Sequence, residues 1–344
     1  MWSGGAVLAV LIAGSVAGAG VSAAAGTVPA GGTARAGVAG LGGPHDWPLE
    51  VALSHGGRLV ATADTDGTAR LWTVATRRQD GGPIRVHGQV LDVAFSPDGR
   101  LVATADSDGT VRLWSVRTHR QAGRAFQVSG VRVSSVAFSP NGRLLATGGI
   151  GGRARLWAVG TRRQVGVAMA PGAKAIDGVA FSPNGRLLAT TDSDFRARLW
   201  SVATQRAVGR PIGHEGGVGV FSVAFSPDSR LLATIGNDTS DLDNLRVWSV
   251  ATQRQVGRGM SAGSTAAYAV AFTPDGRTLV STDTSGSIRQ WSVATHRQVR
   301  PPIIPPGGIE FMGAALSPGG EVLLTTRFLG PAQFWKLAAA RPAR

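Results

Sequence analysis

The chain has 344 residues, of which 43% are hydrophobic and 16% charged, a balance that excludes a disordered polyelectrolyte and predicts a globular protein. It contains no Cys, which excludes disulfides, thiolate metal sites and a cysteine nucleophile. Its formal net charge of +14 suits contact with nucleic acid or with an anionic surface.

The first 26 residues differ in composition from the rest of the chain. From Ala6 to Ala25 there is no charged residue, and a helix of this length would span about 30 Å, the thickness of a bilayer core. The small residues Ala23–Ala25 suit a cleavage site. We predict that residues 1–26 are a signal peptide or a transmembrane anchor, so that the protein is secreted or membrane-anchored. The alternative is a cytoplasmic protein whose start codon is mis-set inside a longer linker rich in Ala and Gly.

A repeat occupies residues 44–338, after a linker at 27–43. Tryptophan recurs about every 42 to 48 residues, at Trp72, Trp114, Trp157, Trp200, Trp248, Trp291 and Trp335. The motif Val-Ala-Phe-Ser-Pro-Asp-Gly, or a close variant of it, begins at Val93, Val136, Val179, Val223 and Val270, with weaker copies at Val51 and Ala314. Seven copies at this period predict a seven-bladed β-propeller.

One copy shows how each blade is built. Residues 91–96 form an apolar strand that ends at a Pro-Asp-Gly turn, and residues 101–105 form a second strand. Residues 111–116 form a third strand, and residues 121–126 a weaker, less apolar fourth strand, as expected of an outer edge. The fold class is therefore all-β, with blades of four antiparallel strands.

These motifs resemble the WD-repeat family, and the bias toward Arg over Lys indicates a bacterial member. The resemblance implies a polar tetrad of His, Ser or Thr, Asp and Trp that holds each blade. In the first two blades it assigns His45, Thr62, Asp66 and Trp72, and then His87, Thr104, Asp108 and Trp114. In the later blades it assigns the hydroxyl to Thr147, Thr190, Thr234, Thr282 and Thr325, while Gly151 and Ser285 replace the turn Asp. We interpret these repeated residues as structural.

The ring needs a closing strand in its seventh blade. Only nine residues follow Trp335, and they include Pro342. We predict that residues near 33–41 supply the outer strand, since an open ring would leave an unpaired edge. The competing possibility is that the short tail at 339–344 fills this place.

No motif supports catalysis. Gly259–Gly263 matches the pattern of a hydrolase nucleophile elbow, but it lies between strands and lacks the following helix. The Asp-rich turns that begin at Asp64 and Asp106 lack the acidic twelfth residue of a calcium loop. We therefore expect no enzyme activity, no cofactor and no metal.

Arginine recurs with the repeat as well, for example at Arg100, Arg143, Arg186 and Arg230 after the first turn. Charge that recurs in every blade is distributed around the ring, whereas a nucleic-acid site is usually a patch or stripe with interleaved aromatic residues. This pattern argues against nucleic acid and favours a weak contact with an anionic surface such as lipid.

Residues that break the repeat mark a candidate partner site. They lie where the second turn of each blade and the connection to the next blade are expected to share one face. The candidates are Trp47, Tyr268, Glu310, Phe311, Asn237, Asp241 and Asp243. Aromatic anchors with a polar rim favour a protein interface. The alternative for Trp47 and Phe311 is that they fill the interior of the ring.

The function that follows is a monomeric, non-catalytic scaffold that binds proteins. The alternative is an enzyme or small-ligand propeller with its site at the central channel. That alternative predicts carboxylates that converge at the channel mouth.

Overall fold

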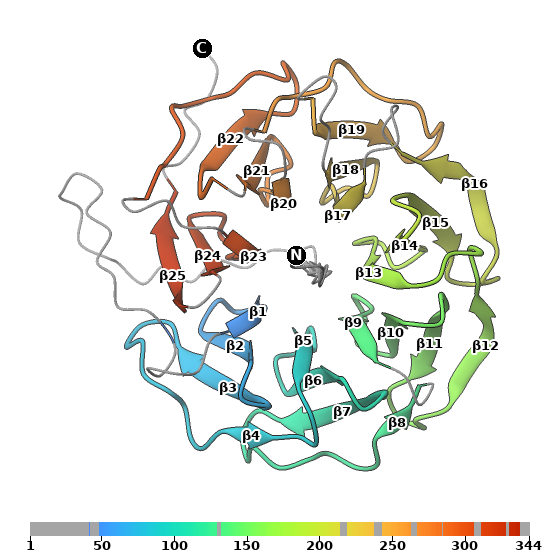
Figure 1. Cartoon of the computed structure of the whole chain (residues 1–344), viewed down its shortest axis with the longest axis vertical. Coiled ribbons are helices and arrows are strands. Elements are labelled where there is room, and N and C mark those ends of the chain that lie inside the picture. The colour runs from blue at the N-terminus through green and yellow to red at the C-terminus, as the bar shows by residue number, and fades with distance from the viewer. Residues whose placement is uncertain are drawn as a thin grey trace, which may run out of the picture.

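The computed structural model describes residue 41 and residues 48–128, 132–213, 219–236, 243–262, 267–283, 285–305, 311–327 and 330–337. Seven antiparallel sheets stand around a common centre like the blades of a propeller (Figure 1). The first strand of each blade lies nearest the centre and the later strands lie progressively further out. The predicted all-β, seven-bladed architecture is confirmed.

The strands follow one another blade by blade. Blade one contains β1 (Pro48–Leu53), β2 (Leu59–Asp64), β3 (Thr68–Thr73) and β4 (Ile84–Arg85), and blade two contains β5 (Val90–Phe95), β6 (Leu101–Asp106), β7 (Thr110–Ser115) and β8 (Phe126–Gln127). Blade three contains β9 (Val133–Phe138), β10 (Leu144–Gly149), β11 (Ala154–Ala158) and β12 (Gln164–Met169). Blade four contains β13 (Ile176–Phe181), β14 (Leu187–Asp192), β15 (Ala197–Ser201) and β16 (Ala207–Ile212). Blade five contains β17 (Val220–Phe225), β18 (Leu231–Gly236) and β19 (Leu245–Ser249), and blade six contains β20 (Ala267–Phe272), β21 (Thr278–Asp283) and β22 (Ile288–Ser292). Blade seven contains β23 (Phe311–Leu316), β24 (Val322–Arg327) and β25 (Gly330–Lys336). In blades five and six, isolated bridges such as Leu245–Met260 and Ile288–Ile303 take the place of a regular fourth strand.

The first turn of each blade is a compact polar unit. In blade two, the Ser96 hydroxyl accepts the Leu101 N–H at 2.9 Å and donates to Asp98 at 2.6 Å. Gly99 adopts φ +68°, a left-handed conformation that glycine accepts without steric cost. The turn therefore holds its own hydrogen bonds, which explains why the motif recurs wherever the first strand ends.

The blades hold together by packing face to face. A typical cluster joins blades two and three, where Phe126 meets Trp157 edge-on with 5.9 Å between ring centroids. Each blade Trp is between 5% and 9% exposed. Each of these indoles belongs to a core cluster shared with the preceding blade, so seven such clusters hold the ring together.

Blades seven and one close the ring. Leu41 is fully buried and pairs with Ala332 of β25 through two backbone hydrogen bonds of 3.0 Å. It shares a cluster with Val51 and Trp72 of blade one and Leu324 of blade seven. Leu41 thus lies at the outer-strand position that the closure hypothesis assigns to residues near 33–41. Residues 33–40 and 339–344 lie outside the described residues, so the choice between the two termini stays a prediction.

The turns divide between the two ends of the blades. In blade two, the Val116 N–H bonds the Arg100 carbonyl, so the third turn lies beside the first. The Ser107 N–H bonds the Gln89 carbonyl, so the second turn lies beside the connection from blade one. We call the end with the second turns and blade-to-blade connections the connection face, and the opposite end the arginine face. Within the described residues, no helix has the length and apolar character needed to cross a membrane.

Candidate functional site

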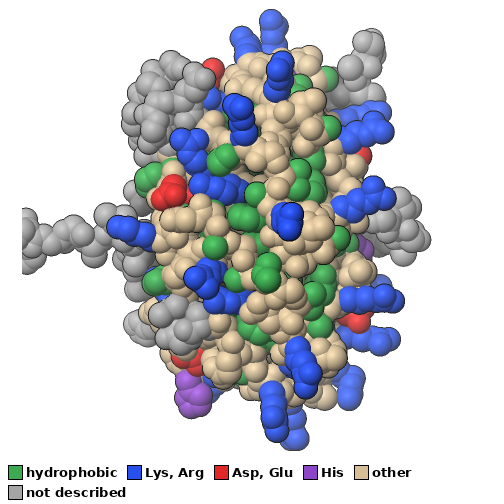
Figure 2. Space-filling model, turned by 90° about the vertical axis from the view of Figure 1, so that its right-hand side faces the viewer, with side chains coloured by type: hydrophobic (Ala, Val, Ile, Leu, Met, Phe, Trp, Pro, Cys, Tyr) green, Lys and Arg blue, Asp and Glu red, His purple; other side chains and the backbone are tan. Residues whose placement is uncertain are grey.

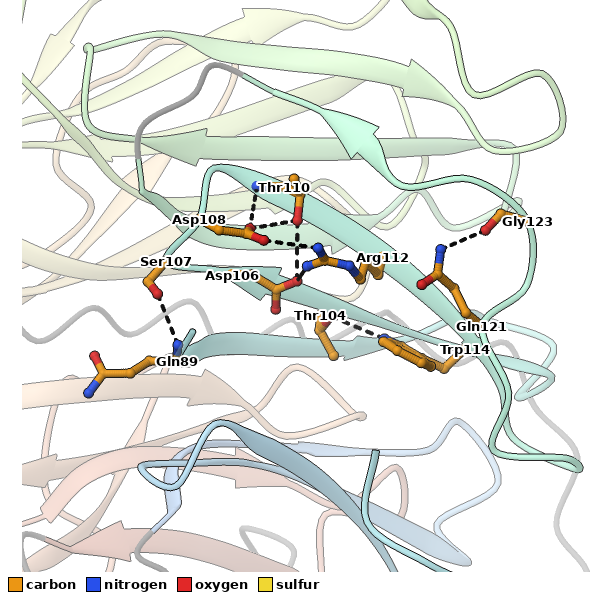
Figure 3. Close-up of polar contacts among 10 residues, drawn as sticks. All are labelled: Gln89, Thr104, Asp106, Ser107, Asp108, Thr110, Arg112, Trp114, Gln121 and Gly123. Carbon is orange, nitrogen blue, oxygen red and sulfur yellow. Dashed lines mark hydrogen bonds and ion pairs between the residues drawn. The ribbon is translucent and has the colours of Figure 1, made fainter. Parts of the chain in front are cut away.

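A polar network anchors the connection face in blade two (Figure 3). Trp114 donates its indole N–H to the Thr104 hydroxyl at 3.1 Å. Arg112, two residues earlier on β7, lies between two carboxylates: it contacts Asp106 and places Nη2 2.9 Å from Asp108 Oδ2. The network joins the second strand, the second turn and the third strand into one rigid unit. Blade one repeats it with Thr62, Asp64, Asp66, Arg70 and Trp72.

The two carboxylates of this network differ in environment. Asp106 is fully buried, and burial raises its pKa to about 6 although Arg112 opposes the rise. Asp108 is more exposed; burial works against ionisation there too, but hydrogen bonds from Arg112 and Thr110 lower its pKa below the usual value. The buried partner of the arginine is therefore the Asp at the end of the second strand, and the turn Asp is the outer one.

This arrangement corrects the predicted tetrad. His87 is exposed, and within the described residues its side chain has no hydrogen bond, while His45 lies outside them. The Asp of the predicted tetrad, Asp108, is bonded instead by the guanidinium of Arg112, which also bonds Asp106. In blade six, Trp291 donates to Ser281 at 3.0 Å and not to Thr282, because the register turns Thr282 to the other side of the sheet.

Three aromatic rings from three successive blades meet at the connection face. Phe195 lies in the second turn of blade four and meets Phe221 of β17 edge-on, with 6.3 Å between centroids. Phe221 in turn packs against Tyr268 of β20 at 5.8 Å. We call Phe195, Phe221 and Tyr268 the aromatic cluster. Phe221 and Tyr268 are half-buried, whereas Phe195 is 48% exposed.

Phe195 occupies a backbone position that disfavours it. Its φ is +63°, and the equivalent residues of blades one and two are Gly67 and Gly109, with φ of +79° and +85°. A left-handed conformation costs a residue with a Cβ about 1 kcal/mol or more. Burial offsets only part of that cost, because the residue remains 48% exposed. A strained, exposed aromatic side chain is typical of a residue retained for contact with another molecule.

Blade three lacks the carboxylates that pair with arginine in its neighbours. Gly149 and Gly151 stand where blade two has Asp106 and Asp108, and Arg155 has no ion pair within the described residues. Burial first, and then repulsion by Arg153, lowers the pKa of Arg155. The guanidinium is therefore half-buried, and none of the described residues forms an ion pair with it.

Two further cationic residues border the second turn of blade three, because the Ile150 N–H bonds the Arg132 carbonyl and the Gly151 N–H bonds the Lys174 carbonyl. Arg132 has a buried Nε with no hydrogen-bond partner among the described atoms. The charge of Arg132 acts on Asp177, whose pKa burial raises to about 6 against this opposing charge. Lys174 connects this region to the aromatic cluster, because its N–H bonds Ser193 Oγ at 3.1 Å in the turn that carries Phe195. We call Arg132, Arg153, Arg155 and Lys174 the basic cluster.

The comparison with protein families agrees with this geometry. The family described as "WD domain, G-beta repeat" matches residues 41–73, 82–115, 124–158, 168–201, 206–249 and 258–292. The chain belongs to the WD-repeat family. The six matches cover blades one to six, and the structure adds the seventh at β23–β25. No curated protein matches the chain.

The predicted partner residues of this WD-repeat propeller have different surroundings. Tyr268 lies in the aromatic cluster. Asp243 is half-buried and lines two cavities, of about 410 and 320 Å³. Phe311 is 0% exposed and packs on Trp335 at 5.9 Å. It belongs to the core, so the burial of Phe311 fits the alternative that it fills the interior of the ring better than contact with a partner. The other predicted residues lie outside the described residues: Trp47, Glu310, Asn237 and Asp241.

Two carboxyl groups converge on the innermost strands. Glu50 of β1 and Asp92 of β5 are 1% and 2% exposed. Burial, and then the charge of Asp92, raises the pKa of Glu50 well above its usual value. Asp92 accepts the Val136 N–H at 2.8 Å and the Ser135 hydroxyl at 3.1 Å, so it ties blade two to blade three. Within the described residues, no group of three or more His, Asp or Glu side chains is placed to hold a metal ion.

Sequence reasoning missed Phe195, Phe221 and the basic cluster. A signal for Phe195 was present, since the turn Asp-Ser-Asp-Gly of blade two becomes Asp-Ser-Asp-Phe in blade four. A signal for Arg155 was also present, in the loss of both acidic residues around Gly151. Both appear only when each blade is compared with its neighbours position by position.

Proposed function

We propose that this WD-repeat protein is a non-catalytic scaffold that binds protein partners through its connection face. The observation that carries the proposal is Phe195, an exposed aromatic side chain held at φ +63° where other blades have glycine. Aromatic side chains beside partly buried neighbours are the usual centres of binding energy in protein interfaces. The aromatic cluster offers such a centre across three blades.

The basic cluster suggests what the partner presents. It follows the aromatic cluster around the same face, through the contact between Lys174 and Ser193. An arginine without a carboxylate gains most from a partner that supplies one, because a charge-assisted hydrogen bond then replaces an uncompensated charge. The preferred partner is therefore a peptide segment with an apolar side chain for Phe195 and an acidic one for Arg155.

The burial of Glu50 and Asp92 supports the scaffold over an enzyme of the central channel. Glycoside hydrolysis, for example, needs two carboxyl groups that flank a substrate. These two carboxyl groups are almost wholly covered by protein, and Asp92 is engaged with the backbone of blade three. We keep export or anchoring as a further proposal, which rests on the composition of residues 1–26 alone.

A displayed library of random peptides tests the partner site. Peptides selected on the full chain are measured again on Phe195→Gly, which removes the ring and relieves the backbone strain, so that the fold is retained. The matched control is Val167→Ser, which removes a 64% exposed apolar side chain from the outer strand β12. We expect Phe195→Gly to weaken the selected peptides at least tenfold and Val167→Ser to leave them unchanged. Equal binding by all three proteins would contradict the proposal.

A further inference from the structure

The arginine face concentrates positive charge that the sequence spreads evenly along the chain. In blades one to six, both the first turn and the third turn carry an exposed arginine at this end of the strands. The first turns carry Arg58, Arg100, Arg143, Arg186, Arg230 and Arg277. The third turns carry Arg78, Arg120, Arg163, Arg206, Arg254 and Arg297. Because these two kinds of turn lie at the same end of the strands, charge that recurs around the ring also gathers on one face.

Few acidic residues offset this charge. The acidic residues in the first turns are Asp98, Asp228, Asp275 and Glu321, while blades three and four have Asn in the turn. The pairs that form are loose: Arg100 lies 4.0 Å from Asp98, with side chains 85% and 59% exposed. Exposed pairs of this kind neutralise little. Figure 2 views the disc from its side and shows Lys and Arg side chains standing along the right-hand edge, with few acidic side chains between them.

We propose that the arginine face binds the anionic surface of a lipid bilayer, lying flat against it. A ring of cations at similar height on a broad disc can meet a plane at many points together. Each arginine that approaches an anionic bilayer strengthens binding on the order of fivefold, so a dozen exposed arginines suffice for firm attachment even if half of them make contact. The connection face would then point away from the membrane and stay open to proteins.

The same geometry disfavours nucleic acid as the occupant. A duplex is a rod, and it would meet the arginines of only a few blades at a time. Single-stranded nucleic acid is bound by aromatic side chains that stack on its bases. Among the described residues, the turns of the arginine face contain no Phe, Tyr or Trp: His55 to Leu59, Pro97 to Leu101 and Val116 to Gln121 are representative. Charge without stacking residues or a groove suits a surface of lipid headgroups.

Vesicle sedimentation with the full chain tests this inference. The probes are vesicles of phosphatidylcholine alone and vesicles that also contain phosphatidylserine, at low and at physiological salt. The test variant replaces four exposed arginines of the face by glutamine: Arg100→Gln, Arg143→Gln, Arg186→Gln and Arg230→Gln. The matched control makes the same change in net charge on the outer rim, with Arg85→Gln, Arg124→Gln, Arg210→Gln and Arg258→Gln, all exposed. Equal thermal midpoints of the three proteins show that the fold is retained.

We expect the wild type and the control to bind the phosphatidylserine vesicles in a salt-dependent way, and the test variant to bind on the order of a hundredfold more weakly. Binding through residues 1–26 is distinguishable, because it would occur on phosphatidylcholine alone and equally in all three proteins. A loss of less than about threefold in the test variant, or an equal loss in the control, would overturn the inference. Tighter binding to duplex DNA than to the vesicles at the same salt, lost in the test variant, would assign the face to nucleic acid instead.

Discussion

Asp92 provides a test of how burial sets the stability of the ring. It is 2% exposed, and burial raises its pKa to about 7, although hydrogen bonds from Val136 and Ser135 oppose the rise. In the unfolded chain the pKa is near 3.9. A raised pKa means that the protonated form favours folding. The contribution of Asp92 is therefore fully present below about pH 4 and is lost as the pH rises through about 7.

The size of this effect follows from the difference between the two pKa values. At 1.36 kcal/mol per pKa unit, the loss amounts to about 4 kcal/mol between pH 4 and pH 8, as an upper bound for a single group. Asp92→Asn keeps an oxygen that can accept both hydrogen bonds and cannot ionise. Its buried amide adds a constant offset to the free energy of unfolding, and a constant offset does not depend on pH.

Urea denaturation at a series of pH values from 4.5 to about 8.5 measures the difference. We expect the free energy of unfolding of Asp92→Asn, relative to wild type, to rise by several kcal/mol across this range. Glu321→Gln, at an exposed position, is the control and should run parallel to wild type. Parallel curves for Asp92→Asn and wild type would refute the reasoning, since they would mean that Asp92 ionises freely in the folded protein.

Two further comparisons test the network of the connection face. Arg112→Gln leaves Asp106 buried without its cation and should lower the free energy of unfolding by about 2–3 kcal/mol. Arg155→Gln removes a cation that has no ion pair among the described residues, and it should lower the free energy of unfolding by less than about 1 kcal/mol. Equal losses for the two variants in urea denaturation would contradict the pairing of Arg112 with Asp106. Ser281→Ala removes the hydroxyl that accepts the Trp291 indole N–H and should lower the free energy of unfolding by about 1–2 kcal/mol. Thr282→Val should change that free energy by less than about 1 kcal/mol. If Thr282→Val instead had the lower thermal midpoint of the two, Thr282 would be the indole's acceptor, as the sequence predicted.

The architecture was predictable from sequence because a propeller repeats its local chemistry. The Ser-Pro-Asp-Gly turn, the spacing of the tryptophans and the apolar strands between them each recur in chain order. Local hydrogen bonds such as Ser96 to Asp98 form within a few residues, so the sequence pattern contains them almost completely. The number of blades and the position of the first three strands follow from that pattern alone.

The contacts between strands were less predictable because they depend on register. A shift of one residue moves a side chain to the other side of a sheet, and this separates Ser281 from Thr282. The residue type alone suggests Thr282 as the acceptor of the Trp291 indole N–H, since the acceptor in every other blade is Thr. The strand register assigns the role to Ser281 instead, because Ser281 is the residue that pairs with Arg289. Strand position also accounts for the burial of Phe311, because its position on β23 matches the buried Val90 of β5.

The two faces of the ring differ in how far the blades resemble one another, and this difference bears on what each can bind. Arginine occurs at equivalent turns of the arginine face in six blades, so that face presents nearly the same chemistry in every direction. A surface without distinct positions can recognise charge but cannot specify a register or an orientation for a folded partner. The connection face is the opposite case, because its second turns differ between blades: Gly151 of blade three replaces the Asp108 of blade two, and Phe195 of blade four replaces its Gly109. We therefore expect specific protein recognition at the connection face, and uniform attraction to an anionic surface at the arginine face, as proposed above.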